Sequence, residues 1–335
     1  MKSRDGTVAR NAGQAANILG LHYQNINLLP KAQYGFREGH STTDQVIYFC
    51  QSIIDAQNKR PTNHTVAVFL DLTKTFDRVW NQKLITKLYE VFGISGRALM
   101  WIYAFLRNSL IRVNFNNSLS RNFKLSQGVP QGSVLSLILS SLFLSGIEQV
   151  TNGRRERDSF ADDIVLWRTG TDLKKLESDV NQAFVDLWNF AEDHKLSFNP
   201  SKSTVGFFIG QLYNFHPNTL LNHQILAVNK HPKCLGFVLD GEILSNKHID
   251  HLVMRARRQL NILKYISGRD WGADASTIRY SYISLIRPIL EYGYPIYCCA
   301  SDTNLKGFSL VLLVLLVFGT LAPKTFYFTK QICNL

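Results

Sequence analysis

The sequence predicts an α+β fold. Short β-rich runs and amphipathic helical patterns are mixed along the chain, without the strict strand–helix alternation of a doubly wound parallel sheet. A chain of 335 residues has room for one large domain or two to three subdomains. Its apolar fraction of 45% is that of an ordinary globular protein and can fill a sizeable core.

The first predicted element is a helix that follows a basic loop. Residues 1–30 show no clear period, and we expect them to be poorly ordered. The loop "QYGFREGH" then leads to three hydroxyl residues, each of a type that can cap a helix: Ser41, Thr42 and Thr43. Apolar residues recur on one face of this helix: Val46, Ile47, Cys50, Ile53 and Ile54.

A strand, a second helix and a hairpin follow. The run "TVAVFLDL" over residues 65–72 is β-rich, and Asp71 stands near its end. The stretch "QKLITKLYEVFG" predicts a helix that ends at Gly93. Over residues 111–126, the apolar residues Ile111, Val113 and Phe115 alternate with polar ones before an Asn-rich turn, which predicts a β-hairpin.

The middle of the chain predicts a glycine-rich loop, "QGVPQGS", that leads into an apolar helix. The segment "SFADDIVLW" then reads as strand, turn and strand, with Asp162 and Asp163 at the turn. Residues 171–194 form the clearest amphipathic helix, capped by Thr171. The apolar residues of its core face recur at three and four positions: Leu173, Leu176, Val180, Phe184, Leu187 and Ala191.

The remaining predicted elements are strands and one long helix. Residues 196–210 read as a strand, an Asn-Pro turn and a strand, and residues 233–240 as one further strand. Residues 246–266 predict an amphipathic helix. Its core face consists of Ile249, Leu252, Ala256, Leu260 and Leu263. Its basic remainder consists of Arg255, Arg257, Arg258 and Lys264.

The net charge and the cysteine content limit which partners and which cellular compartment the sequence allows. Lys and Arg number 37 against 25 Asp and Glu, a net charge of +12, which favours an anionic partner, nucleic acid before an acidic membrane. Five cysteines without a CxxC pair favour a reducing compartment. The N-terminus lacks a signal-type apolar core, and "FSLVLLVLLVF" is shorter than the about 20 residues of a membrane span. We therefore expect an intracellular protein of the nucleus or cytoplasm that is neither secreted nor in a membrane.

A zinc site is not predicted, although one spacing resembles a zinc finger. His231 and Cys234 are followed by His248 and His251. Cys234, however, opens a run that reads as a buried strand, and the two later histidines begin an amphipathic helix.

Carboxylates near predicted strand ends form the candidate catalytic site. Asp71 follows one strand, and Asp162 and Asp163 lie between two others much later in the chain. Like charges brought together in a dry site need cations, and Mg²⁺ accepts carboxylates together with substrate phosphates. Two such ions clamp the attacking and leaving oxygens of a phosphoryl displacement. A solvated turn remains the simpler explanation of an Asp pair taken alone.

Seven motifs in order carry a family resemblance. They are "QYGFREGHSTTD", "FLDLTKTFDRV", "QGVPQGSVLS", "FADD", "NPSKS", "LGFVLD" and "LIRPILEYGYPIY". Together they resemble the reverse transcriptase domain of non-LTR retrotransposons of the jockey-like arthropod group, over residues 31–305. The resemblance implies a right-hand polymerase, with fingers and a ferredoxin-like palm in residues 31–240 and a helical thumb in residues 241–305. Residues 1–30 would be an N-terminal remnant.

The resemblance also implies the reaction and its site. An RNA-directed DNA polymerase would use two Mg²⁺ ions, an RNA template, a DNA primer and deoxynucleoside triphosphates, and no obligate protein partner is evident. By motif position, Asp71 and Asp162 would bind both metals, and Asp163 would support the second carboxylate. The implied nucleotide-binding residues are Arg37, Leu72, Phe76, Gln131, Gly132 and Lys202. The implied primer-grip residues are Leu235 and Gly236, and the implied contacts to the nucleic-acid backbone are Arg255, Arg257 and Arg258.

Three of these roles have a simpler structural alternative. Phe76 would exclude a ribose 2′-hydroxyl, or it packs in the core. The three arginines would follow duplex phosphates, or they form a solvated helix face. The charge of Arg37 would meet a triphosphate, or it is solvated in its loop.

The chain departs from the family pattern in several places. Thr75 stands where Ala is common, Leu137 stands where Pro is usual, and the charged run "GRRERDS" precedes "FADD". The alternative function is therefore an inactive remnant that retains only nucleic-acid binding. We expect the chain to be a piece of a longer element polyprotein.

Residues 306–335 form an aberrant apolar tail that we do not expect to belong to the thumb. The run "VLLVLLV" has no polar face. A frameshift explains such a tail, since one shifted reading frame can give both this run and "PKTFYFTKQICNL" a family-like continuation. Truncation after Leu305 should then improve solubility, because an exposed apolar run favours aggregation.

Overall fold

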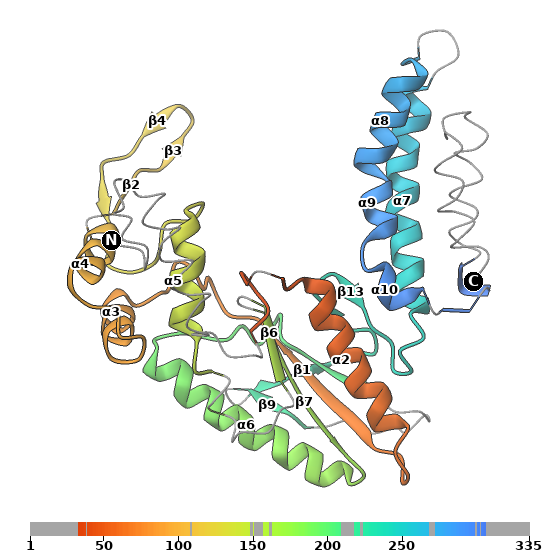
Figure 1. The fold of residues 1–335 in the computed structure, drawn as a ribbon, viewed down its shortest axis with the longest axis horizontal. Coiled ribbons are helices and arrows are strands. Elements are labelled where there is room, and N and C mark those ends of the chain that lie inside the picture. Colours follow the sequence, from red (N-terminus) through yellow and green to blue (C-terminus); the bar gives the residue numbers. More distant parts are fainter. Residues whose placement is uncertain are drawn as a thin grey trace, which may run out of the picture. The chain divides into compact units, whose positions relative to one another are not determined.

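The computed structural model describes most of the chain between residues 33 and 305 (Figure 1). The described residues are 33–37, 39–107, 109–147, 150, 157–160, 163–208, 218–221, 224–267, 272–298, 300–301 and 303–305. The expectations for residues 1–30 and 306–335 lie outside them. The chain divides into two compact units, which we describe separately. Unit 1 is Met1–Gln45, Thr65–Val205 and Asn214–Val228, and unit 2 is Val46–His64, Gly206–Tyr213 and Asn229–Leu335.

A five-stranded sheet organises unit 1. Its order is β11 (Ala227–Val228), β8 (Thr204–Phe208), β1 (His64–Leu70), β7 (Asp163–Gly170) and β6 (Arg157–Phe160). The middle strands are the most apolar: six residues of β1 and five of β7 are buried, as strands covered on both faces require. The predicted strand over residues 65–72 is confirmed as β1, and the predicted strands on either side of "FADD" are confirmed as β6 and β7, which pair antiparallel.

Among the described residues of unit 1, four helices lie wholly within it. They are α3 (Asn81–Glu90), α4 (Gly96–Leu106), α5 (Val134–Leu144) and α6 (Leu173–Asp193). Helix α6 packs on β7, and α3 packs on both α4 and α5. The prediction that Thr171 caps α6 is wrong by one residue. The Asp172 carboxylate is the cap, because one of its oxygens accepts the backbone N–H groups of Lys174 at 2.9 Å and Lys175 at 3.4 Å.

The predicted hairpin over residues 111–126 is confirmed as a ribbon of short paired strands. Strand β2 (Leu110–Ile111) pairs with β5 (Phe123–Lys124), and β3 (Asn114–Phe115) pairs with β4 (Ser118–Leu119). A second small hairpin in unit 1 joins β9 (Leu220–Leu221) to β10 (Gln224–Ile225).

Helix α2 (Thr42–Gln57) begins with a reciprocal cap. The Ser41 hydroxyl accepts the N–H of Asp44 at 3.2 Å, and the Asp44 carboxylate accepts the N–H of Ser41 at 2.8 Å. The prediction that Ile47 faces the core is wrong, since it is 37% exposed. The buried stripe passes through Phe49 instead, whose ring meets Phe208 edge to face within unit 2.

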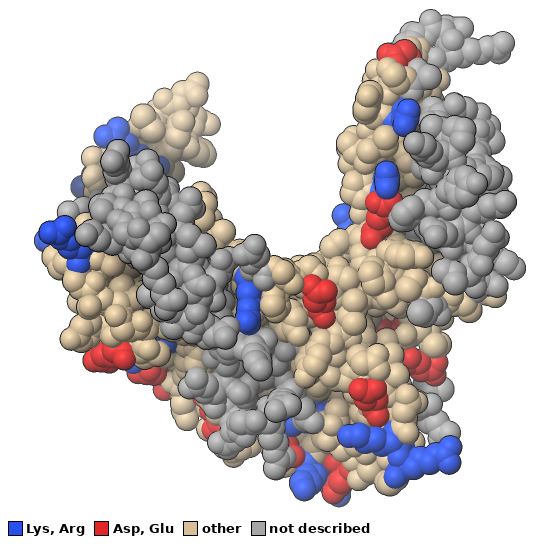
Figure 2. All heavy atoms as spheres, in the orientation of Figure 1, with Lys and Arg blue, Asp and Glu red and all other residues tan. Residues whose placement is uncertain are grey.

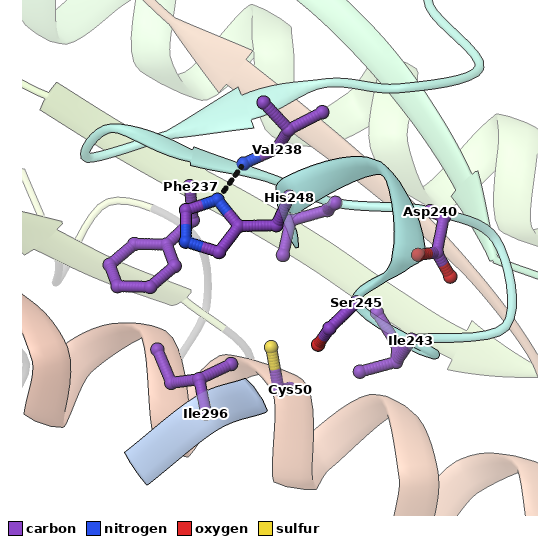
Figure 3. A pocket seen from close by; sticks show the side chains of 9 residues that line it. Cys50, Phe237, Val238, Asp240, Ile243, Ser245, His248 and Ile296 are labelled. Carbon is purple, nitrogen blue, oxygen red and sulfur yellow. Dashed lines mark hydrogen bonds between the residues drawn. The ribbon is translucent and has the colours of Figure 1, made fainter. Parts of the chain in front are cut away.

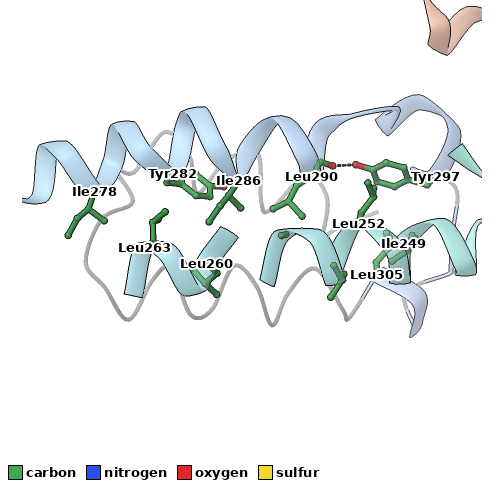
Figure 4. Close-up of a cluster of buried hydrophobic side chains, with 12 residues drawn as sticks. Ile249, Leu252, Leu260, Leu263, Ile278, Tyr282, Ile286, Leu290, Tyr297 and Leu305 are labelled. Atoms are coloured by element: carbon green, nitrogen blue, oxygen red, sulfur yellow. Dashed lines mark hydrogen bonds between the residues drawn. The ribbon is translucent and has the colours of Figure 1, made fainter. Parts of the chain in front are cut away.

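The C-terminal part of unit 2 is helical. Helix α7 (Asn246–Ile266) packs against α8 (Ala275–Leu285) and α9 (Arg287–Glu291), and α10 (Tyr294–Tyr297) follows. The predicted core face of α7 is confirmed in full, with Ile249, Leu252, Ala256, Leu260 and Leu263 all buried. Figure 4 shows four of them, Ile249, Leu252, Leu260 and Leu263, in one cluster with Tyr282, Ile286 and Leu290 from the following segment.

Candidate active site

Two of the three predicted carboxylates lie at the same end of the sheet in unit 1. Strands β1 and β7 are neighbours, and Figure 1 shows them running in opposite directions. Asp71 directly follows the last residue of β1, and Asp163 is the first residue of β7. An antiparallel pair brings the end of one strand beside the start of the other. Asp162 lies outside the described residues.

The backbone of Asp71 is held by the segment that contains "NPSKS". The N–H of Asp71 donates to the Ser203 hydroxyl at 3.2 Å, and the carbonyl of Asp71 accepts the N–H of Asn199 at 2.9 Å. Leu72 forms an antiparallel bridge with Phe198. The predicted strand over residues 196–210 thus begins as a short pairing that fixes the end of β1.

The side chain of Lys202 reaches the Asp71 carboxylate. Its Nζ lies 3.7 Å from Asp71 Oδ2, and the two side chains are 68% and 33% exposed. The ammonium group therefore lies beside the carboxylate without enclosing it. A partly exposed carboxylate, with a second one at the start of the neighbouring strand, is the hard oxygen donor set that Mg²⁺ prefers.

The glycine-rich loop is fastened to the turn after Asp71. Gly128 donates its N–H to the Val79 carbonyl at 2.8 Å, and Val129 donates to the Phe76 carbonyl at 2.9 Å. The amide of Gln131 donates to Asp77 Oδ1 at 3.1 Å. These bonds hold the loop "QGVPQGS" against the turn "KTFD", so the two motifs act as one structural feature.

The two glycines of this loop differ in their surroundings. Both have a φ of +91°, which strains any residue with a Cβ. A Cβ on Gly128 would lie 2.9 Å from the backbone oxygen of Asp77, whereas a Cβ on Gly132 would meet nothing within 4 Å. Within the protein, the close backbone approach therefore occurs at Gly128, whereas Gly132 lies in open space and has a φ that favours glycine.

The other predicted nucleotide-binding residues differ in exposure. Phe76 is half-buried and does not belong to the buried core. Leu72 is 5% exposed, so its side chain is buried. Thr75 is buried at the position where Ala is common, and its hydroxyl donates to the Leu72 carbonyl at 3.5 Å. Arg37 is half-buried in the loop before α2.

In unit 2, the predicted primer-grip residues form a tight turn. Residues 233–240 are not one strand as predicted, because the chain folds back between β12 (Lys233–Cys234) and β13 (Phe237–Val238). The two turn residues, Leu235 and Gly236, have φ values of +48° and +86°. The Tyr292 hydroxyl donates to the Leu235 carbonyl at 2.5 Å, and the Tyr292 ring stacks on Phe237 at 5.0 Å.

A small pocket beside this hairpin is lined by Cys50, His248 and Asp240 among others (Figure 3). His248 Nδ1 accepts the N–H of Val238 at 3.3 Å, and burial and the neighbouring His251 and Arg255 lower its pKa to about 4. Burial also raises the pKa of the Cys50 thiol to about 12. A protonated thiol and a packed neutral imidazole describe a polar part of the core. No cluster of three His, Cys, Asp or Glu side chains able to hold a metal occurs in the described part of the chain.

The three predicted backbone-contact residues lie on the exposed side of α7. Arg255, Arg257 and Arg258 are exposed, opposite the buried stripe of that helix. Within the described ranges, no helix is long and apolar enough to cross a membrane.

Sequence reasoning missed the residues that position the site. Asp77 holds Gln131, while Asn199 and Ser203 hold Asp71. Each stands inside a quoted motif, "KTFD" or "NPSKS", but its partner lies far along the chain. Gly128 is the first glycine of its loop and could have been predicted, because two glycines in one short loop indicate two separate backbone requirements.

The fold belongs to a known structural class. The structure is similar to telomerase from Candida albicans solved with a fragment of telomeric RNA, with a TM-score of 0.50 and 12% sequence identity, covering 96% of this chain and 58% of that one. That likeness concerns the mixed helix-and-sheet fold alone. The chain belongs to the reverse transcriptase (RNA-dependent DNA polymerase) family, which it matches over residues 14–239.

Two curated relatives come from Drosophila melanogaster. The chain is 28% identical over 299 residues to the probable RNA-directed DNA polymerase from transposon BS, covering 86% of this chain and 32% of that protein. It is 25% identical over 284 residues to the RNA-directed DNA polymerase from mobile element jockey, covering 83% and 30%. The predicted kinship with non-LTR, jockey-like elements is thus confirmed, and the chain spans about a third of the length of these relatives.

Proposed function

We propose that this chain is the RNA-directed DNA polymerase domain of a non-LTR retrotransposon. It would extend a DNA primer on an RNA template with deoxynucleoside triphosphates. The observation that carries the proposal is the placement of Asp71 and Asp163 at one end of two neighbouring strands, within a chain of the reverse transcriptase family. Fingers and a ferredoxin-like palm would occupy residues 31–240, and a helical thumb residues 241–305.

Asp71 and Asp162 would hold two Mg²⁺ ions, with Asp163 supporting Asp162. The fit rests on the chemistry of the donors, since carboxylate oxygens are the ligands that Mg²⁺ takes in proteins. When bound, the ions would promote attack by the primer 3′-hydroxyl and stabilise the pyrophosphate that leaves.

The remaining residues of unit 1 bind and orient. Lys202, whose ammonium lies 3.7 Å from Asp71, would donate a proton to the leaving pyrophosphate. The half-buried ring of Phe76 would exclude a 2′-hydroxyl from the incoming sugar. Gln131 and Gly132, in the loop held by Asp77, would line the place of the incoming nucleotide and its template base. Arg37 would meet the triphosphate.

The residues of unit 2 would bind the primer and the duplex. Leu235 and Gly236, in the turn supported by Tyr292, would contact the primer backbone. Arg255, Arg257 and Arg258 would neutralise duplex phosphates from the exposed side of α7.

Primer extension on poly(rA)/oligo(dT) with Mg²⁺ tests the proposal. We expect incorporation of deoxythymidine that stops when the metal is chelated. A chain that binds the primer–template but extends nothing under these conditions would be the inactive remnant, and the proposal would be wrong for this copy.

A further inference from the structure

A β-ribbon in unit 1 has no role in the proposed reaction. We use this name for Leu110–Lys124, which comprises β2, β3, β4 and β5 and projects beyond α4 in Figure 1. Asn116 and Asn117 form its tip with φ values of +47° and +61°, the two positive values of a type I′ turn. Phe115 pairs with Ser118 immediately before this turn. The tip is therefore a defined structure that presents Phe115 at its end.

One face of the ribbon is an open apolar row. Ile111 and its partner Phe123 lie on one face of the β2–β5 pair, and Val113 and Phe115 follow Ile111 at alternate positions of the chain. Their exposed fractions, in this order, are 44%, 42%, 56% and 74%. Contiguous apolar side chains this exposed mark a surface that binds something.

The charge of the ribbon selects the kind of partner. Arg112, Arg121 and Lys124 belong to it, and the sequence from Val91 to Ile147 contains no Asp or Glu. On the face drawn in Figure 2, the spheres of the ribbon are tan and blue, with no red among them. The surface thus complements a polyanion.

One cation lies beside a ring on the apolar face, and Arg112 and Lys124 lie on the opposite face because they alternate with the apolar row. The Arg121 guanidinium lies 5.3 Å from the centre of the Phe123 ring. Aromatic rings beside cations are the elements that bind single-stranded nucleic acid, because bases stack on rings while phosphates meet Lys and Arg. An acidic lipid surface would satisfy the charge, but it would leave the rings of Phe115 and Phe123 without stacking partners.

We propose that the β-ribbon binds single-stranded RNA. Bases would stack on Phe115 and Phe123 with Arg121 beside them, and phosphates that pass over the edge of the ribbon would meet Arg112 and Lys124. The proposal rests on the proposed function in one respect, that RNA is the nucleic acid this chain handles. The site itself is separate from the carboxylates at the end of the sheet.

Binding without synthesis tests the inference. The full chain is titrated into a fluorescent single-stranded RNA of about 20 nucleotides, with no primer and no triphosphate, and anisotropy is followed. We expect Phe115→Ala to weaken binding about tenfold, since one base loses its stacking partner. The plot of log affinity against log salt has a negative slope. Replacing Arg112, Arg121 and Lys124 together with Gln should make this slope less steep by about 2.

Matched controls lie on exposed helical surfaces of the same unit. Tyr89→Ala removes an aromatic ring that is 58% exposed on α3, and Lys175→Gln removes an exposed charge on α6. Both should bind RNA like the unchanged chain. Phe115→Trp adds a direct readout against the five native tryptophans, because the fluorescence it adds over the unchanged chain should be quenched by RNA and not by heparin, which has no bases.

Three results would overturn the inference. One is unchanged binding by Phe115→Ala and by the triple variant, and a second is an equal loss in the control variants. A third is that Phe115→Ala and the triple variant keep their RNA binding but lose binding to vesicles of phosphatidylcholine and phosphatidylserine that the unchanged chain binds. That result would make the ribbon a lipid-binding surface. Asp71→Asn should bind RNA normally whether or not the chain synthesises DNA, so failure of the polymerase proposal would leave this result interpretable.

Discussion

Gly128→Ala and Gly132→Ala form a matched pair that measures how tightly the glycine-rich loop is fastened. Both glycines have a φ of +91°, so alanine brings the same backbone strain to each. That strain costs about 1–2 kcal/mol, and the loss of freedom in the unfolded chain offsets about 0.4–1 kcal/mol of it. We therefore expect Gly132→Ala to lower the free energy of unfolding by about 1 kcal/mol.

At Gly128 the new methyl group meets the backbone. It would lie 2.9 Å from the Asp77 oxygen, 3.2 Å from the Asp77 Cα and 3.2 Å from the Phe76 oxygen. These atoms cannot rotate away as a side chain does, and overpacking of this kind costs about 1–3 kcal/mol. We therefore expect Gly128→Ala to lower the free energy of unfolding by about 2–4 kcal/mol.

Urea unfolding followed by tryptophan fluorescence measures both variants, because Trp167 is buried in unit 1. The expected result is a clearly lower urea midpoint for Gly128→Ala than for Gly132→Ala. Equal midpoints would refute the reasoning, since they would mean that the loop does not press against the turn that holds Asp77.

Three further predictions follow from single side chains. Phe76→Val should raise incorporation of ribonucleotides relative to deoxyribonucleotides while extension persists, because the half-buried ring is lost; an unchanged ratio would return Phe76 to a packing role. The pKa of His248, lowered from 6.5 to about 4 by burial, means that the folded state holds this imidazole neutral. Its stabilisation is complete above pH 6.5 and should fall by up to about 3 kcal/mol as the pH drops toward 4, a slope that His248→Phe should flatten and His231→Phe, at an exposed site, should not. Tyr292→Phe should lower the free energy of unfolding by about 1 kcal/mol, because the Leu235 carbonyl loses its donor; no change would show that water replaces the hydroxyl.

Long periodic elements were predictable from the sequence and short ones were less so. The five residues predicted for the core face of α7 are all buried, because about four turns of helix repeat the same spacing, although His248 and Val253 are buried there too. In α2 the stripe that begins at Val46 continues through Phe49, and the neighbouring Ile47 is apolar yet exposed. Residues 233–240 carry no alternation that distinguishes one strand from two, because the fold-back depends on positive φ values at only two residues.

For the candidate site, the sequence named candidate residues but not the residues that hold them in place. Motif order named Asp71, Lys202 and Gln131, and the structure places Lys202 beside Asp71. The hydrogen bonds that position these residues join distant segments, such as Asp71 with Ser203 and Gln131 with Asp77. Such partners depend on how strands are brought together, which local spacing does not contain.

Primer extension by Asp71→Asn tests the central claim most directly. The change preserves the size of the side chain and removes the charge that would hold Mg²⁺. We expect extension on poly(rA)/oligo(dT) to be abolished while salt-sensitive RNA binding is retained, with Asp162→Asn giving the same result. Glu192→Gln, an exposed carboxylate on α6, is the matched control and should extend the primer normally. Retained extension by either Asp variant would contradict the assignment of the catalytic carboxylates.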